Sequence, residues 1–130
     1  MIIEEELNPE NLAQRAKLAS DALDHEIKRL EAGDERKPPS VKGNIKLRAL
    51  VEDYQELVHN SKKYLASNPA NAAIAALANK AVESWAPIRL KIKRYNELAL
   101  EYNKTHSPKL ETIEERTGFE ITESVKYFDY

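Results

Sequence analysis

A stripe of apolar residues runs from Ile74 to Tyr102 in steps of three and four, and a proline lies within it. Its members are Ile74, Leu77, Ala81, Trp85, Ile88, Ile92, Tyr95, Ala99 and Tyr102. Because such steps keep side chains on one face of an α-helix, this segment must pack a long seam against other helices. The stripe predicts an all-α fold and says far less about function.

The helix that carries this stripe is expected over residues 69–106. Asn68 followed by Pro69 is a helix start signal, and Pro108 lies just beyond the expected end at His106. Pro87 removes one backbone hydrogen bond inside the helix, which predicts a bend near Glu83. The alternative is a split into two helices at Ser84, but the stripe keeps its phase across the proline and favours one bent helix.

Two further helices precede it, over residues 8–32 and 44–67. Asn8 and Pro9 form a start signal for the first, and Gly33 is a natural stop before a polar, proline-bearing loop. Either Ser40 or Asn44 can cap the second helix. Its apolar face is broad, as expected for a helix that contacts two neighbours. We therefore predict one domain over residues 1–130, an antiparallel bundle of three long helices.

The last 23 residues follow a different pattern. Residues 109–116 are expected to form a short fourth helix, and Thr117-Gly118 ends it. An extended tail follows and holds four of the nine aromatic residues: Phe119, Tyr127, Phe128 and Tyr130. Residues 107–130 thus hold a short helix and a tail, and the aromatic density predicts that the tail docks on the bundle or on a second subunit.

Composition narrows the function classes. The chain has no cysteine, which excludes disulfides, cysteine zinc sites and thiol nucleophiles. It shows no signal peptide and no run of the ~18 apolar residues that a membrane span needs, so we expect a soluble, cytoplasmic protein. No catalytic or cofactor motif is visible, and we predict neither an enzyme nor a bound cofactor.

The net charge of −2 conceals a segregation of charge along the chain. Residues 1–34 carry a net −5 and residues 108–130 a net −3, whereas the segments 35–65 and 66–107 each carry +3. Acidic ends that pair with basic helices explain this pattern, and an external anionic partner is the alternative.

The second half of the chain resembles the LemA family. Lys93-Arg94-Tyr95-Asn96-Glu97, Glu101-Tyr102-Asn103, Pro108, Gly118-Phe119 and Tyr127-Phe128-Asp129 follow the order of that family's C-terminal signature. The resemblance covers residues 68–130 and implies a helical bundle without supplying catalytic residues. The family's membrane anchor and its Trp and Leu-Ile-Pro-Asn-Leu motif are absent here, and the stretch from Gly118 to Tyr127 is longer.

Tyr95 and Tyr102 lie seven residues apart on one helix face, and Asn96 and Asn103 lie beside them. An amide there can bond a loop backbone or the C-terminal tail, which we favour over ligand binding. The predicted residues for docking of the tail or a partner are Trp85, Tyr95, Asn96, Tyr102, Asn103, Phe119, Tyr127 and Phe128.

Two helical pairs have metal-ligand chemistry, Glu56 with His59 and Asp21 with His25. Di-iron bundles need two Glu-x-x-His motifs and further inward carboxylates, and the chain has only one such motif. We therefore expect these side chains to lie on solvated helix faces and predict no metal.

Basic residues cluster in two places and give a second functional hypothesis. They are Arg36, Lys37, Lys42, Lys46 and Arg48 around the first loop, and Arg89, Lys91, Lys93 and Arg94 on the long helix. These cations can track phosphates, although no nucleic-acid motif is present and the pI is near 6.0. The sequence favours a non-enzymatic interaction or scaffold protein that self-associates, and the alternative is a bundle that binds nucleic acid or small anions.

Overall fold

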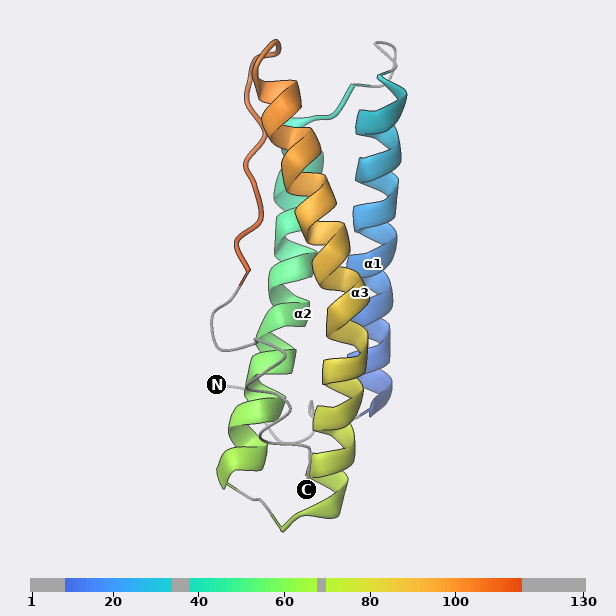
Figure 1. Cartoon of the computed structure of the whole chain (residues 1–130), viewed down its shortest axis with the longest axis vertical. Helices are drawn as coiled ribbons and strands as arrows, with labels where there is room; N and C mark the ends of the chain where they lie inside the picture. The colour runs from blue at the N-terminus through green and yellow to red at the C-terminus, as the bar shows by residue number, and fades with distance from the viewer. Residues whose placement is uncertain (1–8, 34–37, 68–69, 116–130) are drawn as a thin grey trace.

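The computed structural model describes residues 9–33, 38–67 and 70–115. Within these residues the chain forms three long helices, α1 (Pro9–Ala32), α2 (Val41–Ser67) and α3 (Ala72–Asn103), and contains no strand. Figure 1 shows the three helices side by side, with α1 and α3 running in one direction and α2 in the other. The predicted all-α bundle of three long helices is confirmed.

The core contains most of the apolar stripe predicted for the long helix, together with apolar side chains of the other two helices. Tyr54 of α2 and Ile92 and Ala99 of α3 are fully buried, as are Ala19 and Leu23 of α1. These side chains belong to one cluster that all three helices share. Among the described residues, no helix is long and apolar enough to cross a bilayer.

The helix α3 continues without interruption through Pro87. The prediction of a single helix is confirmed, and the alternative of two helices split at Ser84 is wrong. The apolar stripe on both sides of the proline packs into the same core. The bend near Glu83 stays a prediction.

The predicted helix boundaries are wrong at three ends by three residues each. Helix α2 begins at Val41 because the Ser40 side chain accepts a hydrogen bond from the Gly43 N–H at 3.0 Å. Helix α3 begins at Ala72 because Asn71 caps it through the Ala73 N–H at 3.0 Å. The Asn8 cap predicted for α1 lies outside the described residues.

The third difference is the C-terminal end of α3, at Asn103 and not at His106. Residues 104–108 form an exposed turn, in which the peptide between Ser107 and Pro108 is cis. The chain then runs back along the bundle as an extended segment, the strap, which we define as residues 109–115.

The predicted fourth helix over residues 109–116 is wrong for residues 109–115, which have no helical structure. A helix of one or two turns leaves most of its backbone N–H and C=O groups without internal partners. In the extended strap those groups receive partners from side chains of α2 and α3. The aromatic tail with Phe119, Tyr127 and Phe128 lies outside the described residues.

Candidate functional site

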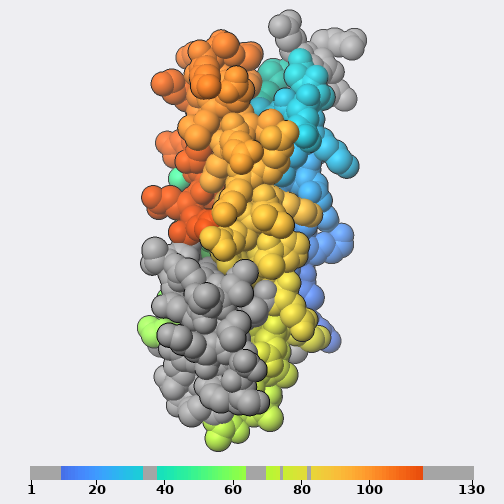
Figure 2. All heavy atoms as spheres, in the orientation of Figure 1, coloured from blue at the N-terminus to red at the C-terminus, as the bar shows by residue number. Residues whose placement is uncertain are grey.

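The strap occupies a groove between α2 and α3, and amide side chains bind its backbone there. Asn103 donates to the Leu110 carbonyl and accepts from the Leu110 N–H, both at 2.7 Å. Asn96 makes the same pair of bonds with Ile113, at 2.9 and 2.8 Å. Each side chain therefore mimics a neighbouring strand, since it serves the N–H and the C=O of a single residue. Figure 2 shows the strap against the surface of α3.

The opposite wall of the groove is α2, which contributes two buried amides. Asn44 donates to the Glu111 carbonyl at 2.9 Å and accepts from the Glu111 N–H at 3.2 Å. Gln55 donates to the Glu114 carbonyl at 3.1 Å. Asn44 is 4 % exposed and Gln55 2 %. An unsatisfied buried amide costs about 1–3 kcal/mol. The free energy of unfolding therefore depends on the strap, which supplies hydrogen-bond partners to both residues.

The contacts alternate along the strap. Residues 110 and 113 bond to α3, and residues 111 and 114 bond to α2. The side chains of Leu110 and Ile113 are buried in the core cluster, whereas Glu111 and Glu114 are exposed. Equivalent positions three residues apart are typical of a polyproline-type chain, and a pleated strand would repeat every two.

Tyr95 connects the two walls. Its hydroxyl accepts a hydrogen bond from the second N–H of Asn44 at 2.7 Å, so both amide hydrogens of Asn44 have partners. Burial raises the pKa of the Tyr95 hydroxyl above its ordinary value, and the hydrogen bond from Asn44 opposes that rise. Glu26 of α1 is buried nearby and adds to the rise.

Two ion pairs lie beside the amide contacts. Arg48 of α2 is 2.8 Å from Glu111, and Arg89 of α3 is 3.2 Å from Glu115. All four side chains are partly or largely exposed, so each pair contributes less than about 1 kcal/mol. The amides and the two buried apolar side chains therefore hold the strap, and the charges favour an acidic segment.

The other predicted docking residues have different surroundings. Trp85 is buried and stacks on Tyr54, with ring centroids 6.3 Å apart. Tyr102 is half-buried and stacks on His106 at 4.1 Å. The rings of Tyr102 and His106 line a hollow of about 500 Å³ at the end of the bundle, beside Pro38 and Pro39.

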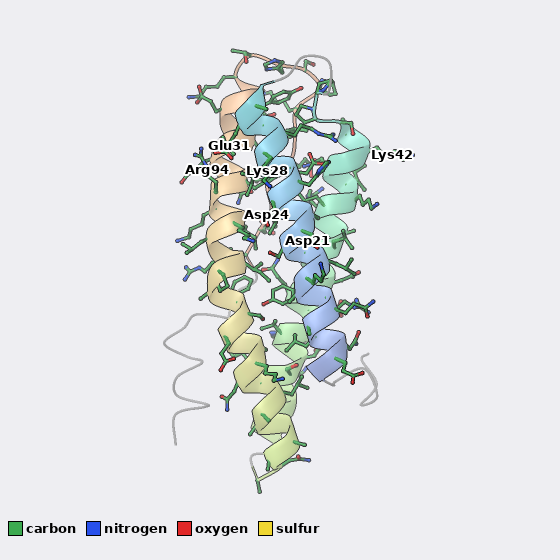
Figure 3. All side chains as sticks on the ribbon, turned by 90° about the vertical axis from the view of Figure 1, so that its right-hand side faces the viewer. Asp21, Asp24, Lys28, Glu31, Lys42 and Arg94 are labelled. Atoms are coloured by element: carbon green, nitrogen blue, oxygen red, sulfur yellow. The ribbon has the colours of Figure 1, made fainter. Side chains whose placement is uncertain are left out.

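The basic residues of α3 form ion pairs with α1. Lys91 contacts Asp24 at 3.0 Å and also donates to Ser20, and Arg94 contacts Glu31 at 3.2 Å. Figure 3 shows Arg94 beside Glu31, whereas Lys42 points away from the bundle. Lys46 and Lys93 are also exposed, and Arg36 and Lys37 lie outside the described residues. The pairs on α3 agree with the reading in which acidic and basic segments complement each other within the chain.

The metal candidates stay apart in the described part of the chain. No group of three His, Asp or Glu side chains comes together there. Asp21 binds Lys17 at 2.9 Å, and His25 shares a hydrogen bond with Arg29. Glu56 is exposed and His59 is half-buried on α2.

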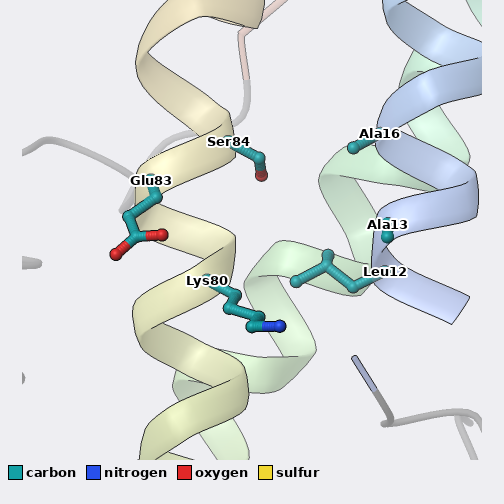
Figure 4. A pocket seen from close by; sticks show the side chains of 6 residues that line it. All are labelled: Leu12, Ala13, Ala16, Lys80, Glu83 and Ser84. Atoms are coloured by element: carbon teal, nitrogen blue, oxygen red, sulfur yellow. The ribbon is translucent and has the colours of Figure 1, made fainter. Parts of the chain in front are cut away.

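A second hollow, of about 390 Å³, lies between the start of α1 and α3. Figure 4 shows Leu12 and Ser84 facing each other across it, while Glu83 points away. Ala13, Ala16 and Lys80 complete the lining. Three of the six lining residues are apolar, and the Ser84 hydroxyl is hydrogen-bonded to Tyr54 and to the Ala81 carbonyl.

Sequence reasoning missed Gln55, and it placed Asn44 at a helix cap. One signal was available: Asn44 and Gln55 fall in register with Leu47, Val51 and Val58 on the apolar face of α2. A polar side chain at a buried position needs a partner, and here that partner is the strap backbone.

Comparison with models of known protein families, with curated proteins and with solved structures finds no match for this chain. The resemblance to the LemA family therefore depends only on the motifs of residues 68–130.

Proposed function

We propose that the protein is a non-enzymatic interaction module that self-associates, and that the groove between α2 and α3 is its binding surface. One observation carries the proposal. Asn44, Gln55, Asn96 and Asn103 direct amide groups at the backbone of an extended segment. Contacts of this kind bind a chain by its main-chain groups, while pockets for alternate side chains supply specificity.

The burial of these amides supports a binding role over simple packing. Apolar residues of similar volume at the positions of Asn44 and Gln55 would extend the core without needing hydrogen-bond partners. Amides there select one occupant, an extended chain with its N–H and C=O groups correctly placed. Among described residues, no buried side-chain nitrogen or oxygen lacks a partner, so the occupied groove is fully satisfied.

The LemA-like motifs belong to the same proposal. Asn96 and Asn103 are the asparagines of the Arg-Tyr-Asn-Glu and Tyr-Asn motifs, and both bind the strap. This geometry gives a physical reason for an asparagine after each tyrosine. The tyrosine packs inward, and the next residue on the helix points toward the groove.

Light scattering of the full chain over a wide concentration range tests the proposal. We expect a mass that rises above the monomer value of 14.8 kDa with concentration. Asn96→Ala combined with Asn103→Ala is expected to weaken association. Asn79→Ala, at an exposed position of the same helix, serves as the matched control. A chain that stays monomeric at millimolar concentration, or a groove variant that associates like the wild type, would refute the proposal.

A third variant locates the surface if association does not involve the groove. Leu90 and Leu100 are exposed on α3, at 68 % and 57 %. Loss of association in Leu90→Lys with Leu100→Lys, with the groove variant unaffected, would assign the contact to these leucines and not to the groove.

A further inference from the structure

Within the described residues, the turn of residues 104–108 joins the strap to α3. Among the described residues, its hydrogen bonds and ion pairs go to side chains of α2 and α3. The contacts that depend on the reversal of the chain are fewer. They include backbone bonds from residues 104–106 to Glu101 and Tyr102, at 3.1 to 3.2 Å, the ring stack of Tyr102 on His106, and the exposed Lys104–Glu101 ion pair. His106 also shares side-chain hydrogen bonds with Thr105 and with the Tyr102 carbonyl. The strap contacts therefore do not require the strap and the groove to belong to one molecule.

Local sequence and observed structure disagree at this turn. Residues 101–106 contain neither glycine nor proline, and the sequence predicts a helix as far as His106. The structure ends α3 at Asn103, although the His106 N–H still bonds the Tyr102 carbonyl at 3.1 Å in the i to i−4 pattern of an α-helix. Opening the turn allows residues 104–106 to join α3, which extends the helix by ~4.5 Å and carries the strap away from its own groove.

We propose that self-association occurs by reciprocal exchange of the strap, in which residues 109–115 of each molecule fill the groove of a second copy. This inference rests on the proposed function and names the partner for the same groove. The second copy supplies the sequence that the groove already fits. Leu110 and Ile113 fill the apolar sites, and Glu111 and Glu115 meet Arg48 and Arg89. Exchange is two-fold and closed, so the assembly stops at a dimer.

A mixing experiment with two complementary variants tests the exchange. The groove variant carries Asn96→Ala and Asn103→Ala, and the strap variant carries Leu110→Ser and Ile113→Ser. Since the natural chain has no cysteine, Asn79→Cys in each chain provides a single site for a fluorescent label. Energy transfer between differently labelled molecules then reports dimers, and circular dichroism confirms that each variant keeps its helices.

Exchange predicts that each variant alone dimerises at least about tenfold more weakly than the wild type, because a groove without its amides, or a strap without its apolar side chains, leaves the strap undocked both within one molecule and between two. The equimolar mixture recovers dimerisation, since the intact strap of one variant fills the intact groove of the other. Failure of the mixture to recover, with both variants individually impaired, would overturn the exchange and leave groove-dependent self-association standing. A wild type that gives no dimer at any concentration would overturn the proposed function as well.

Changing the turn provides a test that leaves groove and strap intact. A variant lacking Lys104 and Thr105 has too short a turn to close on itself and is expected to dimerise at about tenfold lower concentration. Insertion of Gly-Ser-Gly-Ser after His106 is expected to shift the balance toward the monomer. No change, or the opposite order, would overturn the exchange even if the substituted variants fail to fold.

Discussion

The two sides of α3 pack in different ways. Toward α1, helix packs on helix, with the buried Ala19 and Leu23 inside and the Lys91–Asp24 and Arg94–Glu31 pairs at the margin. Toward α2, the helices leave a groove that a non-helical segment fills. A helix satisfies its own backbone, whereas an extended strap does not, so only the second side needs buried amides. The difference shows that buried amides occur in this bundle where an extended backbone needs hydrogen-bond partners.

The largest expected effect is on the shared core. Ile92→Ala removes a fully buried side chain of α3 and leaves a cavity in the core that the three helices share. We expect a loss of about 2–5 kcal/mol in the free energy of unfolding, measured by urea denaturation. A loss below about 1 kcal/mol would show that the helices collapse onto the vacated space.

A smaller loss is expected from the groove side alone. Asn44→Ala leaves the Tyr95 hydroxyl and the Glu111 backbone without their partner. We expect a loss of about 1–3 kcal/mol in the free energy of unfolding, whereas Asn79→Ala at an exposed position changes it by less than about 0.5 kcal/mol. Equal effects of the two substitutions would contradict the importance of the buried amide.

Raising the pH above 10 is expected to lower the free energy of unfolding through two tyrosines between α2 and α3. Burial raises the pKa of Tyr54, whose hydroxyl is hydrogen-bonded to Ser84, and also the pKa of Tyr95. The unfolded-state pKa is about 10, so the neutral hydroxyls contribute their full stabilisation below pH 10 and lose it as the pH rises toward the folded-state values.

Tyr54 is expected to lower the free energy of unfolding by up to about 1.4 kcal/mol per pH unit above pH 10, and Tyr95 is expected to act in the same direction. The measurement compares urea midpoints at pH 10 and pH 11 for the wild type and for Tyr54→Phe. The variant is expected to lose stability less steeply, and an identical slope would show that the Tyr54 hydroxyl ionises equally in both states.

The smallest effect is expected at the margin between α3 and α1. Arg94→Gln breaks the pairs with Glu31 and Glu97, which are about half or more exposed. We expect a loss below about 1 kcal/mol in the free energy of unfolding, and added salt is expected to shrink it further. A loss as large as that of Asn44→Ala would mean that ion pairs hold this side as strongly as amides hold the other.

Sequence patterns predicted the helices well because their cause is local. The stripe of α3 places Trp85, Ile92 and Ala99 in the core, and its phase explains why the helix passes through Pro87. The boundaries were less predictable. Ser40 and Asn44 are equally good caps by residue type, and only the position of Asn44 opposite Glu111 decides between them.

The sequence by itself determined three long helices, the inward face of each, and the pairing of Asn96 and Asn103 on one side of the stripe. These follow from periodicity and from the chemistry of single residues. Only the tertiary structure decided that residues 109–115 are extended, since their backbone partners Asn44, Gln55 and Asn96 come from distant parts of the chain. The local propensity for a short helix does not decide the structure there. A groove lined with amides gives the strap backbone more hydrogen bonds than one isolated helical turn can.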